Sequence, residues 1–257
     1  MNSRTETMVS FLQRTLPVGV LLLAWELVAR TGLVNERVFP PVSEIALRWA
    51  AMLGDGGFYG PLWDTLWRAL VGLGAAIVVG APIGLLMGRT RWAAWLFEPL
   101  FSFFFPLPKI ALIPLYVHLF GIFSLSKVML IFTDCLFPIV IFTYHGARGL
   151  SAIYLWSAQA RGTGRVRIFW RVVLPLSLAS LYDGIQVAAV VAVLVAVVSE
   201  MVSGGSGLGY VMMRAYRYGD VRTAFATLLT ISLVGFALYK VIEWGRERLL
   251  FWHVTES

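Results

Sequence analysis

The sequence predicts an all-α, polytopic membrane protein with about six transmembrane helices. Hydrophobic residues make up 59% of the 257 residues and charged residues only 14%, whereas about a quarter of the residues in a soluble domain are charged. The apolar residues gather in blocks of roughly 20 residues, the length that a helix needs to cross a bilayer. These blocks are apolar on every face, whereas strands of a membrane barrel alternate apolar and polar residues, so helices are favoured.

Six segments of the chain are expected to cross the membrane. They run over about residues 12–29, 63–88, 95–120, 127–147, 175–202 and 223–239. The first has no small-residue cleavage site and is predicted to be a retained helix rather than a signal peptide. The third is broken by Pro106, Pro108 and Pro114. Between the first two spans, Ser43 is expected to cap a short amphipathic helix that ends at Leu53.

The distribution of charge predicts the orientation and excludes some functions. The formal net charge is +7, which we attribute to the positive-inside bias of membrane proteins rather than to binding of nucleic acid. The segment from Arg148 to Arg171 contains five arginines, and no acidic residue lies between Asp134 and Asp183. We therefore expect this loop and both termini to be cytoplasmic, although the arginines at 214, 217 and 222 then fall outside.

Two further features concern packing and metal binding. Small residues recur at every fourth position of the second span, a spacing that allows close approach of another helix. These residues are Gly72, Ala76, Gly80, Gly84 and Gly88. Cys135 is the only cysteine, so the sequence offers neither a disulfide nor a cysteine-based zinc site, and we predict no metal.

The loop between the fourth and fifth spans has a structure of its own. Ser151 is a plausible N-cap for a short helix from Ala152 to Arg161, which Gly162 and Gly164 then end. A second segment, from Arg165 to Val173, leads into Pro175, which suits the first turn of a helix. A simple connection would be shorter. The residues alone leave two interpretations open: a docking surface for a protein, or a helix resting on anionic lipid.

This loop resembles the signature loop of permease subunits of binding-protein-dependent ABC importers. That loop reads Glu-Ala-Ala, three residues, Gly, nine residues, an aliphatic residue, any residue and Leu-Pro. The matching positions are Ala158, Gly162, Val172, Leu174 and Pro175. Trp156 stands where the family has its glutamate, and Ser157 where it has its first alanine.

Other fragments resemble the nitrate, sulfonate, taurine and bicarbonate branch of the same family. They occur in the same order along the chain, at Phe39–Ser43, Pro106–Leu115, Phe120–Ile122, Ser126–Lys127, Glu200–Met201 and Ser206–Tyr210. The resemblance implies one permease domain over residues 1–257, with the fold of type I ABC importers and a coupling loop at about 148–174. The implied location is the bacterial cytoplasmic (inner) membrane. The implied solute is a small organic or inorganic anion such as a sulfonate, or a pyrimidine- or flavin-like precursor.

The resemblance also implies partners. Separate ATPase subunits would bind ATP and Mg, since none of the three lysines follows a glycine as a Walker A loop requires. A periplasmic or lipid-anchored binding protein would deliver the solute, and a second permease chain, identical or different, would complete the path. The residues implied in ATPase coupling are Trp156, Ser157, Ala158, Arg161, Gly162, Arg165, Leu174 and Pro175.

Charged residues inside the spans give candidates for the solute path and one rival function. We select Lys109, Asp134 and Glu200 for the path, because charges inside a membrane are functional candidates by default. Together with Glu26, Glu98 and Asp183 they would also suit an ion-coupled secondary transporter. A second rival is a rhomboid-like serine protease built on Ser206, but the only later histidine is His253, beyond the last span.

Overall fold

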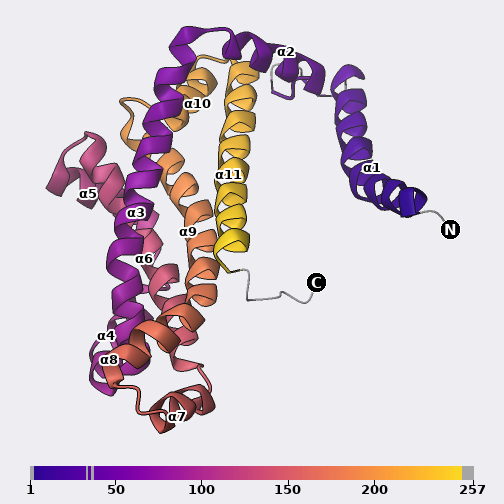
Figure 1. Ribbon diagram of the computed structural model, residues 1–257. Helices are drawn as coiled ribbons and strands as arrows, with labels where there is room; N and C mark the ends of the chain where they lie inside the picture. Colours follow the sequence, from indigo (N-terminus) through magenta and orange to yellow (C-terminus); the bar gives the residue numbers. More distant parts are fainter. Residues whose placement is uncertain (1–2, 33, 36–37, 251–257) are drawn as a thin grey trace. The chain divides into compact units, whose positions relative to one another are not determined.

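The structure is a computed structural model, and every regular element that it describes is a helix (Figure 1). It describes residues 3–32, 34–35 and 38–250, and the side chains from residue 16 onward. The longer helices are α1 (Ser3–Arg30), α3 (Tyr59–Arg89), α6 (Ser124–Arg148), α9 (Leu174–Ser203) and α11 (Val221–Leu249). The shorter ones are α2 (Val42–Leu53), α4 (Arg91–Phe104), α5 (Ile113–Phe120), α7 (Ala152–Ala160), α8 (Arg165–Ile168) and α10 (Leu208–Arg217).

Four continuous helical stretches among the described residues are long and apolar enough to cross a membrane. They are Gly56–Arg89, Ser124–Arg148, Arg165–Ser203 and Val221–Leu249. A fifth would be the pair Arg91–Phe104 and Lys109–Phe120, whose two parts are bent by 85°. The predicted span at 12–29 falls on α1 and begins among residues whose side chains are not described. Five of the six predicted spans therefore have a counterpart in the structure, and the span at 12–29 stays a prediction.

The chain divides into two compact units. The first consists of Met1–Gly60 and Val211–Thr230, and the second of Pro61–Tyr210 and Ile231–Ser257. The prediction of a single domain is not tested by this division, because a membrane bundle can contain more than one compact unit. The residues that concern function lie mostly in the second unit.

In the first unit, the loop between α1 and α2 is held by Trp25. Its indole Nε1 donates a hydrogen bond to the carbonyl oxygen of Pro40 at 3.1 Å, and its ring stacks on Phe39 with centroids 5.0 Å apart. The predicted cap by Ser43 is wrong. Helix α2 begins at Val42 without a side-chain cap on its preceding residue, and Ser43 donates its Oγ to Glu26 Oε1 at 2.8 Å.

In the second unit, α3 packs against α6 along the predicted stripe of small residues. A Cβ atom added to Gly72 would lie 2.5 Å from Ile131 Cγ2, and one added to Gly84 would lie 2.7 Å from the carbonyl oxygen of Val140. A Cβ atom at Gly88 would lie 2.6 Å from Ala147 Cβ. These distances are too short for any side chain, so the predicted packing seam is confirmed.

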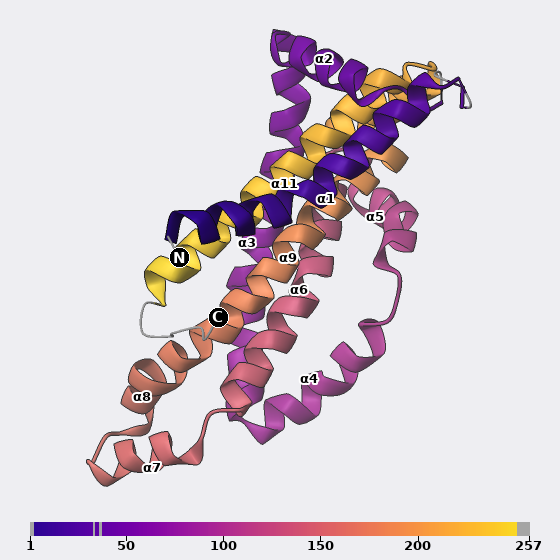
Figure 2. The same cartoon turned by 90° about the vertical axis from the view of Figure 1, so that its right-hand side faces the viewer.

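Helices α6 and α9 run side by side and form the core of the second unit (Figures 1 and 2). The buried residues of these two helices are mostly small or branched, such as Ile131, Ile139, Ala188 and Ala192. Cys135 lies in this core and is free, as predicted. Large apolar side chains on other faces stay exposed, among them Val78, Val190 and Leu194, which suits helices surrounded by lipid.

The third predicted span is broken where its prolines stand. Helix α4 ends at Phe104, a 3₁₀ turn covers Lys109–Leu112, and α5 follows at Ile113 with Pro114 in its first turn. Proline has no amide hydrogen to donate and clashes with the preceding helical turn, so closely spaced prolines prevent one straight helix.

Candidate functional site

The loop that resembles the family signature forms the predicted helix, turn and helix. Ser151 Oγ accepts a hydrogen bond from the backbone N–H of Ile153 at 3.4 Å, so Ser151 caps α7 as expected. The helix ends at Ala160, and Gly162 adopts a φ of +72°. There its N–H donates to the carbonyl oxygen of Gln159 at 2.8 Å. A positive φ is the conformation that favours glycine, which gives the glycine of the signature a structural reason.

Helix α7 has no buried residue, and it lies at one end of the second unit with α8 beside it (Figures 1 and 2). Trp156 keeps 66% of its surface exposed, and Ile153 and Tyr154 are also exposed. Ser157, Arg161, Gly162 and Arg165 are exposed as well, whereas Ala158, Leu174 and Pro175 are partly buried. A helix with large apolar side chains in the open has a surface that suits a binding partner.

The segment after Gly164 connects this loop rigidly to the bundle. Helix α8 covers Arg165–Ile168, a π-helical turn follows over Phe169–Val173, and α9 begins at Leu174. Pro175 lies in the first turn of α9, as predicted. The π turn was not predicted, because one extra residue per turn leaves no clear signal in a short apolar segment.

Two of the three path candidates form a pair with each other. Lys109 Nζ lies 3.4 Å from Asp134 Oδ1, and the two side chains are 9% and 18% exposed. The ammonium group also lies 4.2 Å from the ring centroid of Phe137. Lys109 is therefore a structural partner for Asp134 within the protein. Whether the pair also contacts a solute stays a prediction.

Glu200, the third path candidate, belongs to a buried polar cluster. It accepts hydrogen bonds from Thr65 Oγ1 at 2.8 Å, from Arg68 Nη1 at 2.8 Å and from the N–H of Gly209 at 3.1 Å. Its side chain is 0% exposed and that of Arg68 only 4%. Every hydrogen bond to this carboxylate comes from the protein itself, and we call the group of Thr65, Arg68, Glu200, Ser206 and Gly209 the Glu200 cluster.

The Glu200 cluster fixes the glycine-rich turn that follows α9. Arg68 donates from Nη1 to the carbonyl oxygen of Ser206 at 3.0 Å and from Nη2 to Ser206 Oγ at 2.7 Å. Lys127 Nζ donates to the carbonyl oxygen of Gly204 at 2.6 Å. Ser206 is thus bonded to a cation and not to a base, so this geometry gives no support to the protease. His253 lies outside the described residues.

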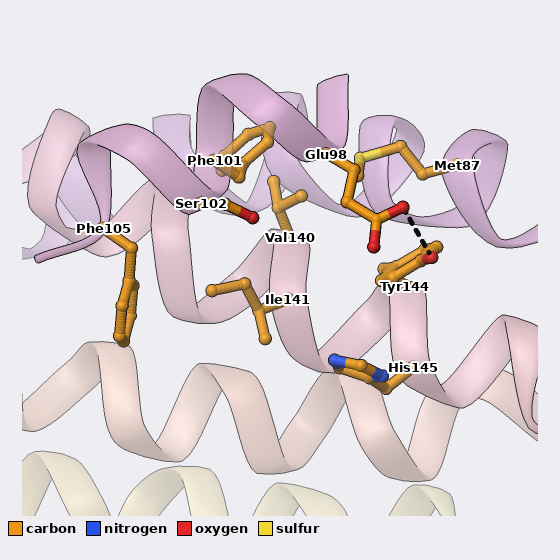
Figure 3. A pocket seen from close by; sticks show the side chains of 9 residues that line it. All are labelled: Met87, Glu98, Phe101, Ser102, Phe105, Val140, Ile141, Tyr144 and His145. Atoms are coloured by element: carbon orange, nitrogen blue, oxygen red, sulfur yellow. Dashed lines mark hydrogen bonds between the residues drawn. The ribbon is translucent and has the colours of Figure 1, made fainter. Parts of the chain in front are cut away.

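A cavity of about 360 Å³ opens between α3, α4 and α6 (Figure 3). Its polar lining consists of Glu98 and Ser102 from α4 with Tyr144 and His145 from α6. Tyr144 donates its hydroxyl to Glu98 Oε2 at 3.3 Å, and aromatic rings form much of the remaining wall. We call this cavity the Glu98 pocket.

In the part of the chain that the structure describes, no group of three potential ligands lies close enough to hold a metal ion.

Sequence reasoning had missed both Arg68 and the Glu98 pocket. Arg68 lies near the start of the second predicted span, and nothing in the surrounding sequence pairs it with Glu200. Glu98 was one of six charges in or near the spans, with nothing to distinguish it. Only the fold brings Tyr144, which is 46 residues away, to its side.

Comparisons with known proteins agree with the fold and with the loop. Residues 80–248 match the family model described as binding-protein-dependent transport system inner membrane component. The chain is 28% identical to the taurine transport system permease protein TauC of Escherichia coli, over 94% of this chain and 90% of that one. It is 30% identical to a permease protein assigned to aliphatic sulfonates transport, SsuC of Escherichia coli, over 86% of this chain and 83% of that one.

A solved structure shows the same fold at low sequence identity. A chain of the MetNI methionine ABC transporter, in an inward-facing conformation, superimposes with a TM-score of 0.60 over 74% of this chain and 94% of that chain, at 18% identity. The fold is therefore that of an ABC importer permease, and the ion-coupled transporter and protease readings are set aside. The chain belongs to the family of inner-membrane components of binding-protein-dependent transport systems, as a multi-pass permease subunit of an ATP-driven importer.

Proposed function

We propose that this permease carries small organic sulfonates into the cell. The observation that carries the proposal is the similarity to taurine and aliphatic sulfonate permeases over nearly the whole chain. A binding protein outside the membrane would deliver the solute, and the permease would provide the path.

The test is uptake by the assembled transporter in a bacterial strain that lacks its own sulfonate importers. The permease would be produced with its ATPase and its binding protein, and uptake of radiolabelled taurine and ethanesulfonate would be measured. We expect uptake of at least one of them, and none when the ATPase carries an inactivating substitution. Uptake of neither compound by an assembled, ATP-hydrolysing complex would contradict the proposal.

We also propose that α7 docks on a separate ATPase subunit, which binds ATP and Mg. Three features support this: the exposed apolar side chains of α7, the sharp turn at Gly162, and the continuous helical path from Arg165 into α9. Trp156 and its exposed neighbours would bury apolar surface in the ATPase, while Arg161 and Arg165 would supply polar contacts around it. Movement of the ATPase would then be passed to α9 through a short and stiff connection.

Gly162 and Gly164 offer a matched pair for testing the docking element. Gly162 has a φ of +72° and Gly164 a φ of −65°, so only the first needs the freedom of glycine. We expect Gly162→Ala to reduce uptake and the binding of ATPase strongly, and Gly164→Ala to change both little. Trp156→Ala should weaken ATPase binding without changing the stability of the permease. Equal behaviour of the two glycine variants would count against the assignment.

The remaining assignments concern the path and the assembly. We propose that Lys109 and Asp134 border the path at the break between α4 and α5, where non-helical backbone must be covered by protein or water. We propose a homodimer of permeases, since identical subunits are the commoner arrangement. Counting the distinct permease chains in the purified complex by mass spectrometry decides between a homodimer and a heterodimer.

A further inference from the structure

The Glu98 pocket presents polar groups on a face that does not suit lipid. Glu98, Ser102 and His145 are all exposed in the single chain, and they lie on α4 and α6, two helices with long apolar segments. An ionised side chain that faces lipid costs roughly 2.5–3.5 kcal/mol on insertion scales. This face is therefore directed toward water, a ligand or the second permease chain.

Only one of the two carboxylate oxygens of Glu98 accepts a hydrogen bond within the described part of the chain. Tyr144 donates to Oε2 at 3.3 Å, and Tyr144 in turn accepts a hydrogen bond from Arg148 Nη1. Within the described part of the chain, Oε1 of Glu98 has no hydrogen-bond partner. Arg148 orients the tyrosine from behind and is not among the residues that line the pocket. The arrangement leaves one carboxylate oxygen available to a donor that comes from outside.

The rest of the lining favours a small molecule with an ammonium group. Aromatic rings beside a carboxylate attract an organic cation through both cation–π and charge interactions, and Phe101, Phe105 and Tyr144 border the same space (Figure 3). The side chains of Ser102 and His145, which have no hydrogen-bond partners among the described residues, offer O–H and N–H donors to an anionic end. The volume of about 360 Å³ lies at the lower end of the range of ligand pockets.

We propose that the Glu98 pocket binds a small zwitterion, with its ammonium group on Glu98 Oε1 and its anionic group on Ser102 and His145. This inference rests on the proposed function, because it narrows the solute from sulfonates in general to aminosulfonates. Glu98 is then the residue that distinguishes a solute with an amine from one without it. A negatively charged solute without an amine gains nothing from Glu98 and is repelled by it.

The test compares taurine with ethanesulfonate, which has the same sulfonate and chain length but no amine. Binding of each to the permease assembled with its ATPase in lipid nanodiscs is measured by titration calorimetry. We expect the wild-type complex to bind taurine more tightly than ethanesulfonate. Glu98→Gln should weaken taurine binding about tenfold or more, the value of a charge-assisted hydrogen bond, and leave ethanesulfonate binding unchanged or stronger.

Two further variants keep the test decisive. Asp183→Asn removes a partly exposed carboxylate elsewhere in the same unit, one that pairs with Arg246 at 3.0 Å, and should leave taurine binding unchanged. Ser102→Phe fills the pocket and keeps both residues of the bond between Glu98 and Tyr144, and it replaces Glu98→Gln as the test if that variant fails to assemble. It should weaken taurine binding by a similar factor.

Several results would overturn the inference. One is equal binding of taurine and ethanesulfonate by the wild type. Another is unchanged taurine binding by Glu98→Gln. If that variant does not assemble, unchanged taurine binding by Ser102→Phe counts instead. Uptake of the two compounds is measured on the same complex. Amine-dependent binding without uptake of either sulfonate contradicts the proposed function and supports the pocket. Uptake without amine-dependent binding supports the proposed function and contradicts the assignment of the Glu98 pocket.

Discussion

The Glu200 cluster and the Glu98 pocket are built from similar side chains and differ in how completely these are bonded. In both, a glutamate accepts a hydrogen bond from a hydroxyl and lies near an arginine. Glu200 has three donors and no exposed surface, whereas Glu98 has one weak donor and stands in an open cavity. A carboxylate whose oxygens are all bonded within the protein holds elements together, and one with a free oxygen is available to a ligand. The two sites should therefore respond in opposite ways to substitution.

The largest loss of folding stability is expected from breaking the ion pair of Arg68 and Glu200. Arg68→Leu or Glu200→Leu leaves one buried charge without its partner, which typically costs about 3–5 kcal/mol. Replacing both residues by leucine should cost clearly less than either single change, because neither of these two buried charges is then left without the other. Thermal unfolding of the purified permease in detergent, followed by circular dichroism, measures the relative stability of the single and double variants. A double variant less stable than both single variants would show that the pair is not the source of the effect.

A smaller effect is expected at the seam between α3 and α6. Gly72→Ala would place a Cβ atom 2.5 Å from Ile131 Cγ2, and such overpacking typically costs about 1–3 kcal/mol. Gly74, two positions along the same helix, has nothing within 4 Å of its Cβ position. Gly74→Ala should be neutral or slightly stabilising, since alanine favours helix over glycine by up to about 1 kcal/mol. Equal losses at both positions would contradict close packing of the stripe.

At the Glu98 pocket the expected effect on stability is close to zero. Glu98→Gln removes a charge that accepts a single hydrogen bond at 3.3 Å, so thermal stability should change by less than about 0.5 kcal/mol. The same variant should lose its preference for taurine over ethanesulfonate. Measuring both quantities on one preparation separates a ligand site from a structural one. A destabilisation as large as that of Glu200→Leu would place Glu98 in the structural class.

A weak dependence on pH is expected at Asp220, in the turn before α11. Burial raises the pKa of this carboxyl, but hydrogen bonds from the N–H and hydroxyl of Thr223 and the charges of Arg48 and Arg222 outweigh it, so the pKa lies below its ordinary value. Stability from this group is present above the unfolded-state pKa of about 3.9. It is lost as pH falls through the lower folded-state value, because the unfolded chain then binds the proton more readily.

Melting curves of the wild type and Asp220→Asn between about pH 3 and pH 6 test this. The wild type should lose more stability than the variant at the acidic end of the range. The difference should be small because the side chains of Asp220 and Arg48 are each 46% exposed and water screens the pair. Parallel curves would mean that Asp220 contributes no proton-linked stability.

Local patterns predicted much of the fold. The helix, turn and helix of the signature loop follow from the side-chain cap by Ser151 and from the backbone preferences of Gly162 and Pro175. The seam on α3 follows from a spacing of four residues, which places small side chains on one helical face. The break in the third span follows from closely spaced prolines. In all three cases, the cause and its effect lie within a few turns of the same segment.

Features that join distant segments were not predictable in this way. Glu200 is 132 residues from Arg68, and no local pattern pairs them. Ser43 looked like a helix cap, but Glu26 from another helix accepts its hydroxyl and its N–H. Likewise Lys109 and Asp134 were recognised as charges that needed an explanation, but not as partners of each other.

The seam between α3 and α6 also constrains how the sequence of α3 can change over evolutionary time. At Gly72, Gly84 and Gly88 even a methyl group meets another atom at less than 3 Å, so these positions accept no side chain unless α6 moves away. Positions on the exposed face, such as Val78, are not packed against α6 in this way and can be replaced by other apolar residues. We expect substitutions in α3 among related permeases to be confined to one side of the helix, and a change at the seam to be accompanied by a compensating change in α6.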